Sequence, residues 1–328
     1  MPHSPVSRGD RCHVILVMSD IAVAVISYNT RDHLRRCLAS VTEDGAREVV
    51  VADNGSTDGS IAMVASEFPM AAVVVDESNP GYGGASNAAI AKCRSSYVLL
   101  LNSDTIVSRG TLDALRRYLD EHPRAAIVGP RLRNLDGTLQ RSIHQFPTPL
   151  VTLLDYSWLG PLVGLVPGVR KLYLASDSHQ HARAVPWVTG AALAIRKTAF
   201  DTVGGFDPSF FMYYEEVDLS YRLFRAGWET HFTPSTDVTH IGGASTSQQR
   251  GPMYAQQIAA AMQYSKRHHS RFAGRRTALA LRFGLACRLA GDTARLTIAR
   301  DSTRRRRLEA NIATLRSMLR GLWRQPAR

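Results

Sequence analysis

The chain has 328 residues, 45% of them hydrophobic and 21% charged, which is ordinary for a folded soluble protein with a sizeable core. It contains no run of about eighteen apolar residues, so we do not expect a membrane-spanning helix. The net charge of +12 is concentrated at one end: residues 266–328 contain seventeen Lys and Arg and three acids, whereas residues 1–265 contain 23 basic and 25 acidic residues.

The cysteines and the first residues indicate a cytosolic protein without a disulfide framework. Cys12, Cys37, Cys93 and Cys287 form no CxxC pair and lie in apolar or helical stretches, which favours reduced structural thiols over a zinc site. The apolar residues 14–18 are too few for the core of a signal peptide, so we expect residues 1–18 to be a flexible extension.

In the first half of the chain, short apolar strands alternate with amphipathic helices. Residues 32–41, for example, place Leu34, Cys37, Leu38 and Val41 at helical spacing. This alternation predicts an α/β fold with a mostly parallel sheet covered by helices. The expected strands are 21–26, 49–52, 73–75 and 97–101, and the expected helices are 32–41, about 60–68, 85–93 and 111–122.

From Gly129 the pattern changes. A hairpin turn is expected at Asp136-Gly137, residues 146–169 show no clear period, and 185–195 are strand-like. Residues 215–226 predict a helix ended by Gly227, followed by a strand at 229–232 and a turn at Pro234. Beyond residue 253 the chain is helical and rich in arginine.

Two loops are candidates for binding a nucleotide. The loop 53–59 follows a predicted parallel strand, and the Asp53 carboxylate can accept hydrogen bonds from a base or a ribose; a turn with a helix cap explains this loop equally well. The glycine-rich loop 79–84 resembles one that cradles phosphate at a helix start. A dehydrogenase would carry its glycines after the first strand rather than the third, which argues against a nicotinamide cofactor.

Asp104 and His240 are candidate metal ligands. Asp104 emerges directly from a buried strand, where a carboxylate and substrate phosphates together can hold Mg²⁺ or Mn²⁺. His240 can supply a second ligand. The alternatives are an Asp that caps the next turn and a His that is packed or solvated.

Three acids beside the aromatic residues 210–214 are candidates for a general base. On a helix, Glu215 and Asp218 share a face, Asp218 can pair with Arg222, and Glu216 points about 100° away from Glu215. Apolar surroundings and neighbouring like charges raise the pKa of a carboxyl group, which suits a base that accepts the proton of a hydroxyl. The alternative is an ordinary charged helix face.

Taken together, these motifs resemble the family 2 glycosyltransferases of the GT-A fold, and among them bacterial rhamnosyltransferases that act on polyprenyl-diphosphate-linked sugars. The resemblance spans about residues 20–265, in order, through the motifs Ser27-Tyr28-Asn29, 53–56, 79–87, Asn102-Ser103-Asp104, 204–207 and 215–219. It implies a Rossmann-like GT-A domain at 19–265 and leaves 266–328 as a basic amphipathic helical tail.

The resemblance also implies roles for individual residues. Asp104 corresponds to the last acid of the family's DXD metal motif, Asn102 stands at the first acidic position, and His240 corresponds to a late metal-ligating histidine. Glu216 takes the place of the catalytic aspartate, with Glu215 and Asp218 as alternatives. The implied donor-binding residues are Ser27, Tyr28, Asn29, Asp53, Asn54, Gly83, Gly84, Asn87, Asn102 and Asp104. The implied acceptor-binding residues are Trp187, Gly190, Gly205, Phe206, Tyr213 and Tyr214.

The implied reaction is an inverting, metal-dependent transfer of a sugar, by likeness L-rhamnose from dTDP-rhamnose, to a polyprenyl-diphosphate-linked saccharide. The basic tail is expected to bind an anionic membrane rather than nucleic acid, which places the protein in the cytoplasm, peripheral on the inner face of the membrane. The alternative is a solvated helical tail without a partner. Two other classes stay open: a non-catalytic nucleotide-sugar binding protein, and a nucleotidyltransferase, although the chain lacks the early glycine-rich loop that the latter needs. The transfer mechanism requires Asp104 and the 215–218 acids to lie at one site.

Overall fold

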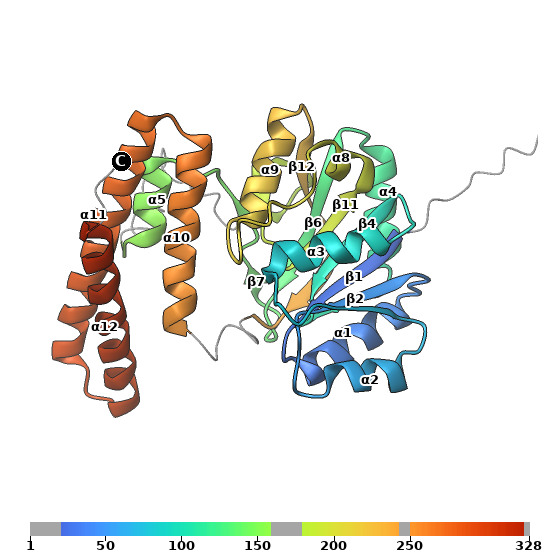
Figure 1. Cartoon of the computed structure of the whole chain (residues 1–328), viewed down its shortest axis with the longest axis horizontal. Helices are drawn as coiled ribbons and strands as arrows, with labels where there is room; N and C mark the ends of the chain where they lie inside the picture. The colour runs from blue at the N-terminus through green and yellow to red at the C-terminus, as the bar shows by residue number, and fades with distance from the viewer. Residues whose placement is uncertain (1–20, 159–178, 243–249, 325–328) are drawn as a thin grey trace, which may run out of the picture.

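In the computed structural model, which describes residues 21–158, 179–242 and 250–324, a mixed sheet is covered by helices on both faces (Figure 1). The sheet order is β3-β2-β1-β4-β11-β6-β12-β5. Strands β3, β2, β1 and β4 are parallel, and β11 runs antiparallel to β4. The expected α/β fold with a mostly parallel first half is confirmed. The strands are β1 (Ile21–Ser27), β2 (Val49–Asp53), β3 (Ala72–Val75), β4 (Tyr97–Asn102), β5 (Thr105–Val107), β6 (Ala125–Arg133), β11 (Ala192–Arg196) and β12 (Glu229–His240).

The core lies on both faces of the sheet. On one face, α1 (Arg31–Glu43) and α4 (Thr111–Glu121) contribute Leu34, Leu38 and Leu115. On the other, α3 (Gly81–Lys92) and α9 (Glu215–Arg225) contribute Ile90 and Leu219. Because β1, β2 and β4 are buried on both faces, they are continuous apolar runs, which is why they could be recognised in the sequence. The remaining helices of this part are α2 (Ser60–Glu67) and α8 (Lys197–Thr202).

Several elements differ from the expectation. The glycines predicted as a loop form the first turn of α3, which begins at Gly81. The strand predicted to end at Phe232 continues as β12 to His240, because an irregularity between Thr233 and Asp237 accommodates Pro234. The strand-like residues 185–195 form three short strands, and the hairpin turn at Asp136-Gly137 is confirmed between β6 and β7. The short strands are β7 (Leu139–Gln140), β8 (Ile143–His144), β9 (Arg183–Val185) and β10 (Trp187–Val188).

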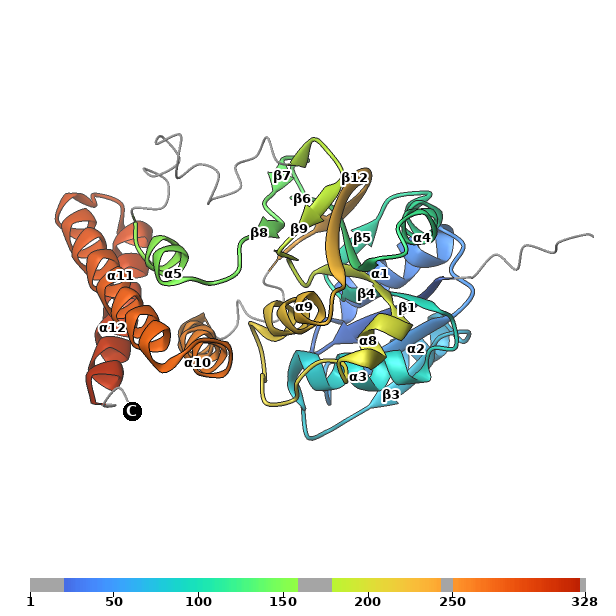
Figure 2. The ribbon, with the colours of Figure 1, turned by 90° about the horizontal axis from the view of Figure 1, so that it is seen from above.

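A helical bundle lies beside the sheet (Figures 1 and 2). It contains α10 (Arg250–His268), α11 (Arg271–Ile298), α12 (Ser302–Arg324) and α5 (Pro149–Tyr156). No helix was predicted at α5, because its residues show no clear hydrophobic period. Tyr156, Ile258, Leu281, Leu285 and Leu315 form its core. The boundary expected at residue 266 falls inside α10. Of the residues described, no helix is long and apolar enough to cross a membrane.

Gly81 determines how closely the start of α3 approaches the chain before α9. Its φ is +78°, and a Cβ at this position would collide with the backbone carbonyl of Phe211. We therefore expect Gly81→Ala to lower the free energy of unfolding by about 2 kcal/mol or more, measured by chemical denaturation.

Gly137 provides the matched control. Its φ is +79°, but nothing lies within 4 Å of the added Cβ. Gly137→Ala introduces only the left-handed strain and should cost about 1 kcal/mol. Equal losses for the two variants would contradict a role for the contact between Gly81 and Phe211.

Candidate functional site

The carboxyl ends of β1, β2 and β4 bring together the candidate donor-binding residues. Ser27 lies opposite Asp53 in the parallel register, and Ile26 lies opposite Asn102. The Ser27 hydroxyl lies 3.3 Å from that of Thr30, which is 2.7 Å from that of Ser103. Three loops are thus tied together at one edge of the sheet, where α/β proteins commonly bind ligands.

The loop after β2 is built around Asn29 and Asp53. Asn29 adopts a left-handed backbone with φ of 50°, and its side-chain oxygen accepts a hydrogen bond from the amide of Thr57. The Asp53 carboxylate accepts from the amide and the hydroxyl of Ser56, each at 2.7 Å. Asp53 is buried, whereas Tyr28 is exposed. The loop after β2 is therefore ordered by its own hydrogen bonds and by those to Asn29 in the loop after β1.

The residues of α3 pack against the segment that precedes α9. The Asn54 amide donates to the carbonyl of Gly81 at 3.3 Å. The Asn87 side chain both donates to and accepts from the backbone of Phe206, at 2.8 and 2.9 Å. A Cβ at Gly83 would contact Phe206 and Glu215, and one at Gly84 would press on Pro80. Close packing between α3 and the 205–215 segment thus accounts for Gly83 and Asn87.

Asp104 and His240 are brought together by strand pairing. Because β12 runs antiparallel to β5 with His240 opposite Thr105, His240 lies next to Asp104, and its Nε2 is 3.4 Å from the Asp104 carboxylate. The amide of Ile241 also donates to the Asp104 carbonyl.

The donor set suits a cation. The Gln140 amide group donates to Asn134 at 3.0 Å, which directs its oxygen to His240 Nδ1 at 2.8 Å. When Nδ1 of the neutral His240 ring donates its proton to the Gln140 oxygen, Nε2 carries a lone pair that faces the Asp104 carboxylate. Because Nε2 and the carboxylate are both electron-rich, a proton or a metal ion is needed between them. Among residues 21–158, 179–242 and 250–324, no group of three or more His, Cys, Asp or Glu is placed to hold a metal. A bound ion would therefore take further ligands from substrate oxygens.

Glu215 and Glu216 begin α9 and point in different directions, as the helical spacing predicts. Glu215 is buried against α3, whereas Glu216 is partly exposed and lies against Gly190. Burial raises the pKa of both carboxyl groups; the charge of Glu216 raises that of Glu215 further, and the Gly190 amide partly offsets the rise at Glu216. The Oε2 atom of each is buried without a hydrogen-bond partner in the described part of the chain. Each carboxyl group therefore holds a proton more readily than an exposed glutamate does.

Gly190 and Ala191 connect Glu216 with the end of β4. The amide of Asn102 donates to the Ala191 carbonyl at 3.0 Å, and the Tyr82 hydroxyl donates to the Gly190 carbonyl at 2.6 Å. Burial raises the pKa of Tyr82, and the charges of Glu215, Glu216 and Asp104 raise it further. The acids at the start of α9 and the Asn102–Asp104 turn therefore lie at the same end of the sheet.

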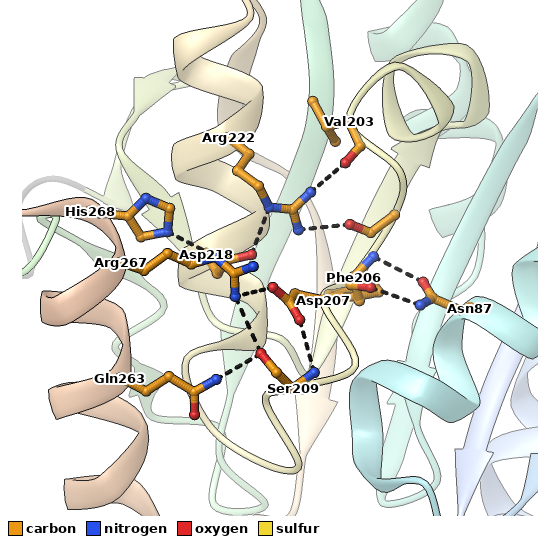
Figure 3. Close-up of polar contacts among 11 residues, drawn as sticks. Asn87, Val203, Phe206, Asp207, Ser209, Asp218, Arg222, Gln263, Arg267 and His268 are labelled. Atoms are coloured by element: carbon orange, nitrogen blue, oxygen red, sulfur yellow. Dashed lines mark hydrogen bonds and ion pairs between the residues drawn. The ribbon is translucent and has the colours of Figure 1, made fainter.

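Asp218 belongs to a different network (Figure 3). Its carboxylate is fully buried and accepts from Arg222 at 2.7 Å, as the four-residue spacing predicts, and from His268 of α10 at 2.7 Å. Arg222 also donates to the carbonyls of Val203 and Gly205. Both carboxylate oxygens are thus engaged in joining α9 to its neighbours.

The candidate acceptor residues have different surroundings. The Trp187 ring stacks on His144 with centroids 4.2 Å apart, and its indole N–H donates to Gln145. Phe206 is buried in the core, and a Cβ at Gly205 would collide with Asn87. Tyr213 and Tyr214 both have positive φ, of 67° and 70°, directly before α9.

Sequence reasoning missed two residues of the site. Tyr82 lies within the glycine-rich motif, and its hydroxyl beside the two glutamates could have been sought there. Gln140 is 100 residues from His240, and no local pattern in the sequence connects the two.

Comparison with known proteins agrees with this arrangement. The profile of Glycosyl transferase family 2 matches residues 22–204, and that of Glycosyl transferase family group 2 matches 169–291. The chain is 35% identical over 243 residues to the N-acetylglucosaminyl-diphospho-decaprenol L-rhamnosyltransferase of Mycobacterium tuberculosis, covering 70% of this chain and 78% of that protein. It is 24% identical to the rhamnosyltransferase WbbL of Escherichia coli K12, covering 67% of this chain and 83% of the relative.

Solved structures share the fold. A mannosyltransferase from Pyrobaculum calidifontis in complex with GDP-Man and Mn²⁺ has a TM-score of 0.56 at 17% identity, covering 94% of this chain and 88% of that one. GalNAc-T7 with UDP, GalNAc and Mn²⁺ has a TM-score of 0.51 at 16% identity, and the match covers 67% of this chain and 43% of that one. The family match over more than half of the residues and the 35% identity to a rhamnosyltransferase show that the chain belongs to glycosyltransferase family 2 and is a glycosyltransferase.

Proposed function

We propose that the protein transfers L-rhamnose from dTDP-rhamnose, with inversion, to a polyprenyl-diphosphate-linked saccharide at the inner face of the cell membrane. The names of its relatives support this choice, because the Mycobacterium tuberculosis relative is an L-rhamnosyltransferase whose named acceptor is a diphospho-decaprenol-linked sugar. We further propose 19–265 as the catalytic domain and the helices after it as the membrane-binding unit.

The observation that carries the mechanism is the Glu216 carboxylate. The residue is partly exposed at the end of the sheet, its buried Oε2 lacks a partner among the described residues, and its pKa is raised mainly by burial. Such a group can remove the proton from an acceptor hydroxyl as that oxygen attacks the anomeric carbon. The bond to the donor diphosphate breaks on the opposite side, so a single displacement inverts the configuration. Glu215 is buried and Asp218 is fully paired, which favours Glu216 as the base.

Asp104 and His240 would hold Mg²⁺ or Mn²⁺, which would neutralise negative charge on the departing nucleoside diphosphate. Gln140 orients His240, and the Asn102–Asp104 turn holds Asp104 beside the proposed donor site. On the donor side, Ser27, Asn29, Asp53 and Asn54 would surround the nucleoside. On the acceptor side, Gly190 borders Glu216, so a sugar hydroxyl placed there would reach the base.

Incubation with membranes and a panel of radiolabelled nucleotide sugars tests the donor, the acceptor and the metal. We expect label from dTDP-rhamnose in the lipid fraction, lost with EDTA and restored by Mn²⁺ or Mg²⁺. Asp104→Asn should lower kcat/KM about 100-fold and raise the metal concentration needed for half-maximal activity, because it removes a charged ligand. Full activity in EDTA would contradict the proposed metal site, and transfer to water-soluble acceptors alone would contradict the lipid-linked acceptor.

Glu216→Gln should reduce turnover about 100-fold or more while donor binding, measured by calorimetry, stays within a few fold. The amide keeps the size of the side chain but cannot accept the proton. Unchanged turnover would show that Glu216 is not the base.

Two matched variants separate catalysis from packing. Glu215→Gln should retain most of the turnover, because this buried side chain does not reach the acceptor. Asp218→Asn weakens the contacts to Arg222 and His268, so it should lower stability more than it changes kcat in the protein that remains folded. A greater loss of kcat in either variant than in Glu216→Gln would move the base to that residue.

The raised pKa of Glu216 predicts how the rate depends on pH. The base is active only when deprotonated, so kcat/KM should rise about tenfold per pH unit below this pKa and level off above it. The rise should lie at higher pH than the ordinary glutamate pKa of 4.5 allows. Glu215→Gln should keep a rising limb and Glu216→Gln should lose it; a profile that Glu216→Gln leaves unchanged would contradict the assignment.

A further inference from the structure

Helix α11 is apolar on two opposite sides. One side packs into the bundle: Leu281 and Leu285 are fully buried, and Gly284 lets α11 approach the backbone of α5 at Leu153 and Tyr156. A helix of a water-soluble bundle normally needs only this one apolar side. The opposite side therefore requires its own explanation.

The second side carries Phe272, Leu279 and Phe283, here called the α11 stripe. These side chains are 71%, 59% and 60% exposed, so the described residues leave them largely uncovered. With a turn of about 100° per residue, all three lie within about 20° of one line along the helix, opposite Leu281. The stripe is thus a continuous apolar surface rather than scattered exposed residues.

The charges around the stripe are positive. Arg275 and Arg276 are exposed on either side of it, and the Arg276 guanidinium lies over the Phe272 ring, 5.6 Å from its centroid. The one acid of α11, Asp292, is buried on the other side of the helix. At the start of α12, the four arginines of 304–307 are also exposed. Exposed aromatic and leucine side chains flanked by arginines are typical of helices that lie in the interface of an anionic membrane.

We propose that the α11 stripe inserts into the interface of an anionic lipid bilayer, with Arg275 and Arg276 among the lipid headgroups. This proposal rests on the proposed transfer to a lipid-linked acceptor and identifies the surface that meets the membrane. A second copy of the chain fits the stripe less well, because pairing two stripes would bring their arginines together.

The contacts of α10 connect this surface with the catalytic helix. Gln263 and Arg267 of α10 donate to Ser209, Arg267 pairs with Asp207, and His268 contacts Asp218 of α9 (Figure 3). Since α10 also packs on α11, the bundle joins the helix that carries the stripe to α9. This connection would hold α9 in a fixed position relative to a bilayer that carries the lipid-linked acceptor.

Co-sedimentation of the full chain with vesicles of phosphatidylcholine, with or without phosphatidylglycerol, tests the proposal. The wild type should bind the anionic vesicles more tightly. The triple variant Phe272→Ser, Leu279→Ser, Phe283→Ser should bind them at least tenfold more weakly, because its apolar contact is lost. Arg275→Gln with Arg276→Gln should weaken binding to anionic vesicles roughly tenfold or more.

Met70→Ser is the matched control, since Met70 is an equally exposed apolar side chain far from the bundle, and its binding should equal that of the wild type. Circular dichroism checks that each variant is folded. Equal vesicle binding by the stripe variant and the wild type would overturn the proposal, as would a stripe-dependent dimer in sedimentation velocity without vesicle binding.

A short-chain, water-soluble acceptor analogue separates this proposal from the proposed function. The stripe variant should retain its transfer to the analogue while losing vesicle binding, and this result supports the membrane role. If no variant transfers rhamnose and the stripe still determines vesicle binding, the proposed function is wrong and the bilayer proposal stands.

Discussion

Two adjacent carboxyl groups, Glu215 and Glu216, are held at the start of α9 with too few partners to stabilise both as anions. The positive end of the helix dipole and the Gly190 amide favour negative charge at this point, whereas burial and the neighbouring charge oppose it. The balance raises both pKa values. The contacts around α9 hold Glu215 and Glu216 together. A looser start of the helix would let water or a cation stabilise the charges of the two carboxyl groups.

The rest of α9 supplies that rigidity. Asp218 is buried one turn after the pair, and its hydrogen bonds to Arg222 and His268 compensate its charge. Arg222 in turn donates to the carbonyls of Val203 and Gly205, which ties the turn after α8 to α9. Tyr214, with its left-handed backbone, packs against residues of both the sheet domain and the bundle. The bundle is thus part of the frame that holds the helix carrying the proposed base.

The sequence was sufficient where local patterns decide the structure. Continuous apolar runs predicted β1, β2 and β4, and the four-residue spacing predicted the pair of Asp218 and Arg222. It was insufficient where pairing between distant segments decides. The continuation of β12 past Pro234 brings His240 to Asp104, and neither the irregularity at 233–237 nor the partner strand β5 has a local signal. Gln140 could not be found for the same reason. The glycines of 81–84 were expected in a loop that cradles phosphate, yet they begin α3, where Gly81 and Gly83 allow close contact with the 205–215 segment.

The charge of the C-terminal helices is not explained by the stability of the bundle. Its core is apolar, formed by residues such as Leu281, Leu285 and Leu315, and the arginines of 304–307 are exposed. Seventeen basic residues with three acids repel one another in the folded state, and pairs such as Arg305 with Glu309 offset little of this because they are exposed. Such repulsion destabilises an isolated bundle and becomes favourable on a surface of opposite charge. Since the first 265 residues are nearly neutral, an anionic membrane would attract one end of the molecule only, which fixes its orientation as well as its position.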